Sequence, residues 1–128
     1  MPPHEQWLQR ADYDVETAEA MYASARYIYV VFMCQQALEK CLKGLLVYQG
    51  KEALPIHNLR RLLEMTGNIA DVDKESLRKI DFLSQFYLNA RYKEDLQELL
   101  RLVGRETARE YLDFTRETLQ WLIQKMTR

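Results

Sequence analysis

The sequence predicts an all-α fold, an up-and-down bundle of four to five helices that forms a single domain over residues 1–128. Three observations support this prediction. Apolar residues recur three and four positions apart along most of the chain, which is the spacing of one helix face. Only 4 Gly and 3 Pro are present, so few sites suit the tight turns that join strands. The segments between the helical patterns are short, and short links favour antiparallel neighbours in a bundle.

The first two helices are expected at residues 5–23 and 26–49. Apolar positions step by three and four through the first of them. The start of the second, residues 27–33, is apolar nearly all round, so this helix has to be covered on more than one face. We therefore expect it at the centre of the fold, with Gly50 as its C-terminal stop.

A loop that contains Pro55 separates the second helix from a short third one. This third helix carries leucines at positions 59, 62 and 63 and is expected to end at Gly67.

The second half of the chain continues the helical pattern to its end. A helix is expected at about 74–89, with Asp71 or Asp73 as its N-terminal cap. A leucine-rich piece at 96–104 and a long helix at 105–126 follow. The long helix presents an apolar stripe, and Phe114 and Trp121 lie beside this stripe and widen it.

Composition excludes several classes of function. With 18 basic and 19 acidic residues the net charge is −1, which argues against a strongly electrostatic nucleic-acid binder. No apolar run approaches the roughly 20 residues that span a bilayer, and the first residues do not form a signal peptide. Cys34 and Cys41 lie two turns apart on one expected helix, about 10 Å, which is too far for a disulfide. We expect buried thiols and a cytoplasmic protein.

No pattern of catalytic or metal-binding residues stands out. The sequence has two histidines, His4 and His57, and no cluster with metal-ligand spacing, so no metal and no cofactor are expected. Neither cysteine has a base paired with it in the sequence, as nucleophilic catalysis requires. The glycines are too scattered to form a phosphate-binding loop.

A row of polar residues on the second helix has two interpretations. The row consists of Gln35, Gln36, Glu39, Lys40 and Lys43. Glu39 and Lys43 are four apart in the order that favours an ion pair. The row is either the solvated face of the helix or a surface that contacts another subunit or a ligand, and the pattern alone does not separate the two.

Two further places offer groups suited to binding. His57 is expected at the start of the third helix, where an imidazole either closes the loop by a hydrogen bond or contacts a ligand. Arg91 and Tyr92 lie between helices, where a guanidinium and an aromatic ring suit a phosphate or a base. The alternative is a surface loop in which Arg91 pairs with Glu94 or Asp95.

Taken in order, these residues resemble a known family. The order is Trp7 and Ala11, then F-x-x-Q-Q-A-x-E-K-x-L-K-x-L-L from position 32, then Pro55, then His57-Asn58-Leu59, and finally Ala90-Arg91-Tyr92. This resembles the HEPN family of prokaryotic helical domains, from about residue 5 to the final helix. The resemblance implies a bundle that commonly dimerises, beside a minimal nucleotidyltransferase encoded next door, often as a toxin–antitoxin pair.

The chain departs from one feature that the resemblance implies. Many members of the family are metal-independent ribonucleases with an Arg followed by a His, four to six residues lying between them. Counted from Arg91, the matching positions hold Leu96, Gln97 and Glu98, and neither histidine has an Arg at this distance upstream. Gln and Glu do not readily replace imidazole as an acid–base group near neutral pH. The resemblance therefore favours a non-catalytic partner or regulatory module of a minimal nucleotidyltransferase. The alternative is an RNA-cleaving toxin with a non-standard site.

The resemblance also places the motifs near one another, which predicts a polar cleft. We expect Arg91 and Tyr92, with His57 and the lysines Lys40 and Lys43, to border a site for a phosphate-bearing ligand, such as a nucleotide or RNA, or for an acidic loop of the partner. The competing interpretation is that Arg91 pairs with Glu39 or Asp95 inside the bundle.

Aromatic content adds the expectation of a homodimer. The chain has 8 Tyr and further aromatic residues, more than one small bundle is expected to cover. These further residues include Phe82, Phe114 and Trp121. Exposed aromatic area tends to mark interfaces, so the surplus favours a second copy of the chain as its cover.

Overall fold

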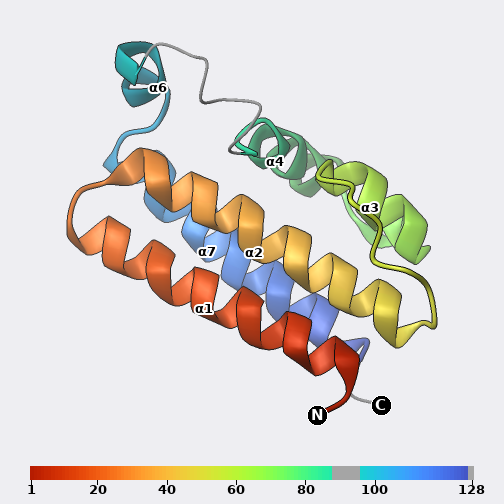
Figure 1. The fold of residues 1–128 in the computed structure, drawn as a ribbon. Coiled ribbons are helices and arrows are strands. Elements are labelled where there is room, and N and C mark those ends of the chain that lie inside the picture. The colour runs from red at the N-terminus through yellow and green to blue at the C-terminus, as the bar shows by residue number, and fades with distance from the viewer. Residues whose placement is uncertain (88–95, 127–128) are drawn as a thin grey trace.

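A computed structural model describes residues 1–87 and 96–126 of the chain. Helices α1 (Pro3–Ala23) and α2 (Tyr27–Tyr48) form a long antiparallel hairpin, and α7 (Arg105–Gln124) packs along both of them (Figure 1). No strand occurs among the described residues. The predicted all-α bundle is confirmed.

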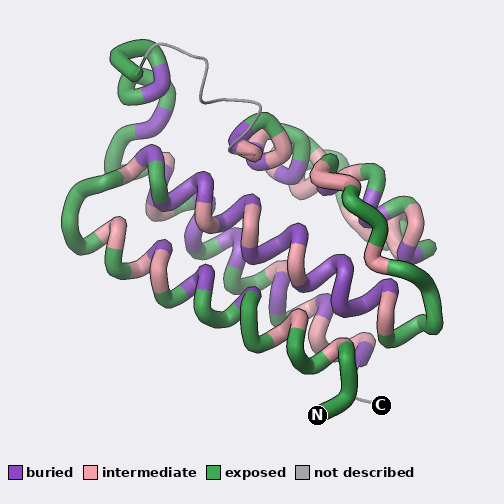
Figure 2. The backbone as a smooth tube through the Cα atoms, viewed as in Figure 1, coloured by how far each residue is buried: buried purple, intermediate pink, exposed green. Residues whose placement is uncertain are grey.

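Helix α2 lies at the centre of the bundle, as its apolar composition predicts. It contacts α1, α3, α4, α6 and α7, and most of its residues are buried (Figure 2). Both cysteines are inside this core as free thiols. A helix surrounded in this way needs apolar residues on several faces, which explains why its first half has almost no polar side.

The hairpin of α1 and α2 depends on one glycine. A Cβ atom built on Gly44 would lie 3.1 Å from the Cβ atom of Trp7 and 3.3 Å from the carbonyl oxygen of His4. Both distances are shorter than ordinary contacts between carbon and its neighbours. Gly44 therefore allows the backbones of the two helices to approach closely near the start of α1.

A second layer is built from short helices whose first turns are capped by side chains, and of the predicted candidates Asp71 and Asp73 it is Asp73 that caps α4. α3 (Leu59–Thr66) and α4 (Lys74–Ser84) are joined through a 3₁₀ turn, η1 (Ile69–Asp71). The side chain of Asn58 accepts a hydrogen bond from the Arg61 amide, and that of Asp73 accepts one from the Ser76 amide. These caps satisfy amide groups that the first turns leave unpaired.

Helix α4 ends earlier than the pattern predicts. It stops at Ser84 instead of continuing to 89, because the last amides bond to the third preceding carbonyl and tighten the chain into a turn. Phe86 then enters the core, where it is 1% exposed and packs near Phe32 and Phe82. The amide of Leu59 donates a 2.7 Å hydrogen bond to Ser84 Oγ, which ties the start of α3 to the end of α4.

The short helix α6 (Leu96–Leu102) lies at one end of the molecule, beside the turn between α1 and α2 (Figure 1). Leu99 and the following Val103 are buried, while the other leucines of this helix are exposed. In the described part of the chain, no helix is both long enough and apolar enough to cross a membrane.

Candidate functional site

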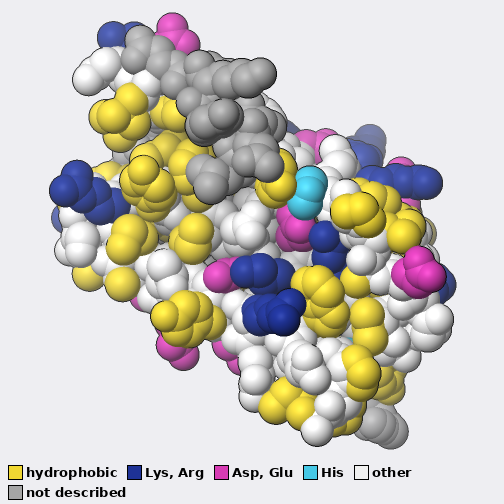
Figure 3. Space-filling model, viewed as in Figure 1, with side chains coloured by type: hydrophobic (Ala, Val, Ile, Leu, Met, Phe, Trp, Pro, Cys, Tyr) yellow, Lys and Arg dark blue, Asp and Glu magenta, His cyan; other side chains and the backbone are white. Residues whose placement is uncertain are grey.

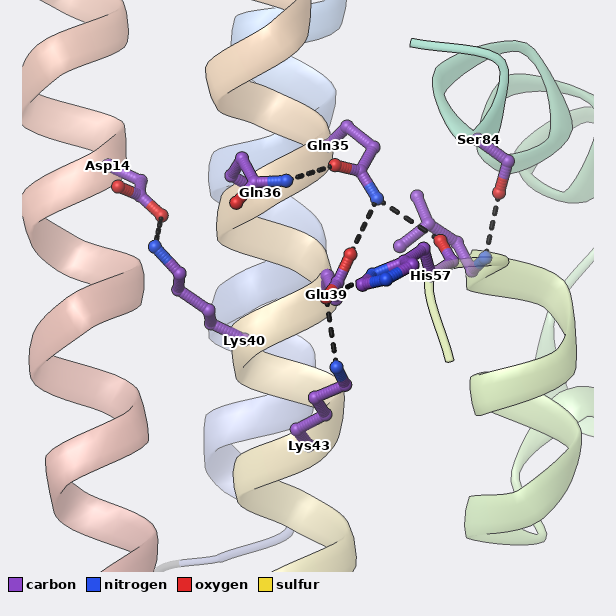
Figure 4. Close-up of polar contacts among 9 residues, drawn as sticks. Asp14, Gln35, Gln36, Glu39, Lys40, Lys43, His57 and Ser84 are labelled. Atoms are coloured by element: carbon purple, nitrogen blue, oxygen red, sulfur yellow. Dashed lines mark hydrogen bonds and ion pairs between the residues drawn. The ribbon is translucent and has the colours of Figure 1, made fainter. Parts of the chain in front are cut away.

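The polar row of α2 divides between two flanks of the helix. Residues 35, 39 and 43 are four apart, so they lie in one line, and this line faces the loop before α3. Lys40 follows Glu39 by one position, a rotation of about 100°, and faces α1 instead. Figure 4 shows the two groups on opposite sides of the helix.

The group that faces α3 is a buried hydrogen-bond network around Glu39. Gln35 Nε2 donates to one carboxylate oxygen at 2.9 Å, and Lys43 Nζ donates to the other at 2.9 Å. His57 Nδ1 lies 2.9 Å from that same second oxygen. Gln35 is 0% exposed, Glu39 7% and Lys43 6%, so the solvated-face interpretation is wrong for these three residues. The predicted pair of Glu39 and Lys43 is confirmed.

Gln35 connects the network to the loop. Its Nε2 also donates to the carbonyl oxygen of His57 at 3.1 Å, and its Oε1 accepts a hydrogen bond from Gln36 at 2.7 Å. Both the nitrogen and the oxygen of the Gln35 side-chain amide are therefore hydrogen-bonded. An amide buried without such partners would destabilise the fold, so this pairing fixes the loop against α2.

The carboxylate of Glu39 determines the state of the network. Burial by itself raises the pKa of Glu39, but hydrogen bonds from Gln35, Lys43 and His57 outweigh burial and hold this pKa below its usual value. Glu39 is thus ionised at neutral pH and only accepts hydrogen bonds. It follows that His57 Nδ1 carries a hydrogen, and that Nε2 of a neutral imidazole presents its lone pair.

The outer side of His57 is partly open. Its ring stacks on Tyr87 with the centroids 3.7 Å apart and the planes 11° apart, and the side chain is 37% exposed. Among the described residues, none hydrogen-bonds to Nε2. We call His57 Nε2 and the Tyr87 ring the imidazole edge. Its chemistry suits accepting a proton or hydrogen bond when neutral, and holding an anion when protonated.

The group on the other flank of α2 is a single ion pair between helices. Lys40 Nζ lies 2.7 Å from Asp14 Oδ2 of α1, and their side chains are 26% and 12% exposed. A shallow hollow beside the pair is lined by residues of α1, among them Arg10 and Tyr13. Lys40 is therefore held on the α1 side of the helix, away from His57.

Of the residues predicted to border one cleft, the structure brings together Lys43 and His57, through Glu39. Lys40 lies on the opposite flank. Arg91 and Tyr92 lie outside the described residues. Glu39 was predicted only as a partner of Lys43 or of Arg91, and Gln35 only as part of the row. Their central place depends on the distant His57 loop, which no local spacing reveals.

Other reactive groups are placed where they cannot react readily. Burial raises the pKa of Cys34 and of Cys41 to about 12, so neither forms a thiolate near neutral pH. Within residues 1–87 and 96–126, no group of three His, Cys, Asp or Glu residues is arranged to hold a metal ion.

Comparison with known proteins agrees with this architecture. The profile of the HEPN domain family matches residues 4–126. The crystal structure of TT1696 from Thermus thermophilus is similar, with a TM-score of 0.83 and 27% identity over 98% of this chain and 99% of that one. The structure of ST0689, described as an archaeal HEPN homologue, has a TM-score of 0.78 and 25% identity over 99% and 100% of the two chains. No curated protein matches the chain.

Proposed function

Because this chain belongs to the HEPN domain family, we propose that it is a non-catalytic partner or regulatory module of a minimal nucleotidyltransferase. In this role it binds the partner enzyme, or a nucleotide, at the imidazole edge. The segment that follows Tyr87 in the sequence carries Arg91 and Tyr92, which supply a guanidinium and a second ring suited to a phosphate or an acidic loop.

The observation that carries this proposal is the self-contained network around Glu39. Gln35 and Lys43 both donate hydrogen bonds to Glu39, and Lys40 forms an ion pair with Asp14. Of the titratable side chains in the row together with His57, that of His57 is the most exposed, at 37%. An oriented imidazole at the surface suits recognition of a partner or a nucleotide by a hydrogen bond or by charge.

Location in the cytoplasm is part of the same proposal. Both thiols are free and buried, and they lie on one helix. Free thiols of this kind fit a reducing compartment.

A homodimer is also part of the proposal. Hydrophobic side chains gather at the end of the molecule where α6 lies (Figure 3). Residues that are about half exposed there are Tyr29, Leu96, Leu100 and Leu102. Exposed apolar patches tend to mark interfaces. We expect light scattering at micromolar concentration to give twice the chain mass of 15.3 kDa. A mass of one chain would contradict the dimer.

The binding role is tested by calorimetry with the purified chain. The titrants are ATP and the nucleotidyltransferase encoded in the adjacent reading frame. His57→Ala and Arg91→Ala are expected to weaken one of these interactions by roughly tenfold or more, as loss of a charged contact at an interface does. His4→Ala and Arg101→Ala are matched controls, since both residues lie on other elements.

Melting temperatures keep this test decisive. Unchanged binding by Arg91→Ala together with a lowered melting temperature would assign Arg91 a structural role. The hypothesis of a polar cleft that includes Arg91 would then be rejected. Absence of binding to both titrants by the wild-type chain would overturn the proposal as a whole.

One observation favours the alternative of an RNA-cleaving toxin. A carboxylate that orients an imidazole, with the other ring nitrogen open, is an arrangement that general bases use. We nevertheless expect no measurable cleavage when purified chain is incubated with structured and single-stranded RNA. Cleavage that disappears in both His57→Ala and Arg91→Ala would establish the toxin function instead.

A further inference from the structure

A separate pocket of about 240 Å³ opens between α2, α3, the start of α4 and α7. Helix α4 contacts α7 through its second half. There the Phe82 ring stacks on Tyr111 at 4.7 Å, and Lys79 pairs with Glu110 at 3.4 Å. The pocket lies beside the first half of α4, next to Asp73 and Ser76.

The inner wall of this pocket is apolar. It is formed by buried leucines of α2 and α3, by Ile80 of α4, and by aromatic rings of α7, the members being Leu38, Leu42, Leu59, Leu63, Ile80, Phe114 and Trp121. A cavity of about 150 Å³ with such a lining stays dry and accepts benzene. A pocket of 240 Å³ therefore has room for a phenyl ring with a short chain.

The mouth of the pocket is acidic. Asp71, Asp73 and Glu117 line it, and no Lys, Arg or His is among the described residues that do so. Asp73 is occupied in capping α4. Neither Asp71 nor Glu117 forms an ion pair with a described residue, so both carboxylates lie at the mouth without a direct cationic partner. The Trp121 indole at the same wall already has a cation near it, with Lys125 Nζ 4.5 Å from the ring centroid.

We propose that this pocket binds a small amphipathic amine. The apolar body of the ligand packs against Trp121 and the leucines, and its ammonium group lies at the mouth between Asp71 and Glu117. Shape and charge both carry this assignment, since an uncharged ligand would leave the carboxylates unmatched and an anion would be repelled by them. The site is distinct from the imidazole edge, so the proposal does not depend on the proposed function.

The test compares two probes of the same shape and opposite charge, 2-phenylethylamine and 3-phenylpropanoate. Methyl NMR of the leucines and Ile80, with the indole signal of Trp121, reports binding to the wild-type chain. We expect the amine to shift these signals in a saturable way and the carboxylate to leave them unchanged. The double variant Asp71→Asn, Glu117→Gln is expected to weaken amine binding roughly three- to tenfold, the range for two exposed ionic contacts.

Two further variants make the outcome unambiguous. Glu16→Gln with Glu106→Gln removes the same net charge from exposed positions outside the pocket and is expected to leave affinity unchanged. Ser76→Phe places a ring at the mouth and is expected to abolish the shifts, while circular dichroism checks that it remains folded. Equal binding of both probes, equal affinity in the Asp71→Asn, Glu117→Gln variant, or no saturable shift with the amine would each overturn the proposal.

Discussion

The two flanks of α2 differ in the number of partners that each charged side chain has. On the α1 side, Asp14 is buried but has a single partner among the described residues, Lys40, whose side chain is 26% exposed and still reaches water. On the α3 side, Glu39 is buried and takes hydrogen bonds from Gln35, Lys43 and His57 (Figure 4). Glu39 and Lys40 are adjacent in the sequence but have different roles. Glu39 is the centre of a hydrogen-bond network that fixes a loop and orients the His57 imidazole, whereas Lys40 forms one ion pair with Asp14.

The difference shows how burial changes the energetic role of a charge. An ion pair that remains partly hydrated contributes little to stability, because water competes for both partners. A buried charge has no such competitor, so every partner that it loses is costly. We therefore expect substitutions on the α3 side to have larger effects than equivalent substitutions on the α1 side.

The largest effect is expected for Glu39→Ala. This change leaves Lys43 buried without a partner and removes a hydrogen-bond acceptor from Gln35 and His57. We expect the free energy of unfolding, measured with urea, to fall by about 3–5 kcal/mol. Glu39→Gln keeps the shape and is expected to cost less. A loss below about 1 kcal/mol for Glu39→Ala would mean that the network is not stabilising.

Acidification tests the same carboxylate with a smaller expected effect, since protonation removes the charge but not the side chain. Because the folded-state pKa of Glu39 lies below its ordinary value of 4.5, its stabilisation is present above pH 4.5 and is lost as pH falls through the folded pKa. We expect the stability difference between wild type and Glu39→Gln to shrink as pH falls through this window. Other carboxylates titrate in both proteins and cancel in the difference. A difference that stays constant as the solution is acidified through this window would contradict the network.

A smaller loss is expected for His57→Ala, about 1 kcal/mol in urea unfolding. The variant loses one charge-assisted hydrogen bond and the stacking on Tyr87, but Glu39 keeps its bonds from Gln35 and Lys43. His4→Ala is a useful comparison, because His4 packs edge-on against Tyr48 at the far end of α2. A loss as large as that of Glu39→Ala would make His57, and not Glu39, the centre of the network.

The smallest effect is expected for Asp14→Asn, at most about 1 kcal/mol. Lys40 is exposed enough for its ammonium group to turn to water when the carboxylate is neutralised. We expect the loss to decrease further in high salt, which screens partly exposed pairs. A loss equal to that of Glu39→Gln would show that the two flanks do not differ as described.

The sequence alone was sufficient for the features that depend on neighbouring residues. Helix periods, the cap of α4 and the stops at Gly50 and Gly67 follow from residues a few positions apart, and the central place of α2 follows from its apolar composition. The Q-Q-A-x-E-K segment, taken in order with the His57-Asn58-Leu59 and Ala90-Arg91-Tyr92 pieces, also indicated the family, because these motifs are specific in combination.

Only the tertiary structure decided how the polar row is used. The predicted cleft grouped Lys40 with Lys43, whereas the packing of α1 and of the His57 loop on opposite flanks of α2 separates them. His57 is 18 residues from Glu39, and Tyr87 is a further 30 residues along the chain. Period and spacing describe one helix at a time, whereas the angles at which helices pack determine which side chains meet. For this reason the helices could be predicted from local pattern, and the network around Glu39 could not.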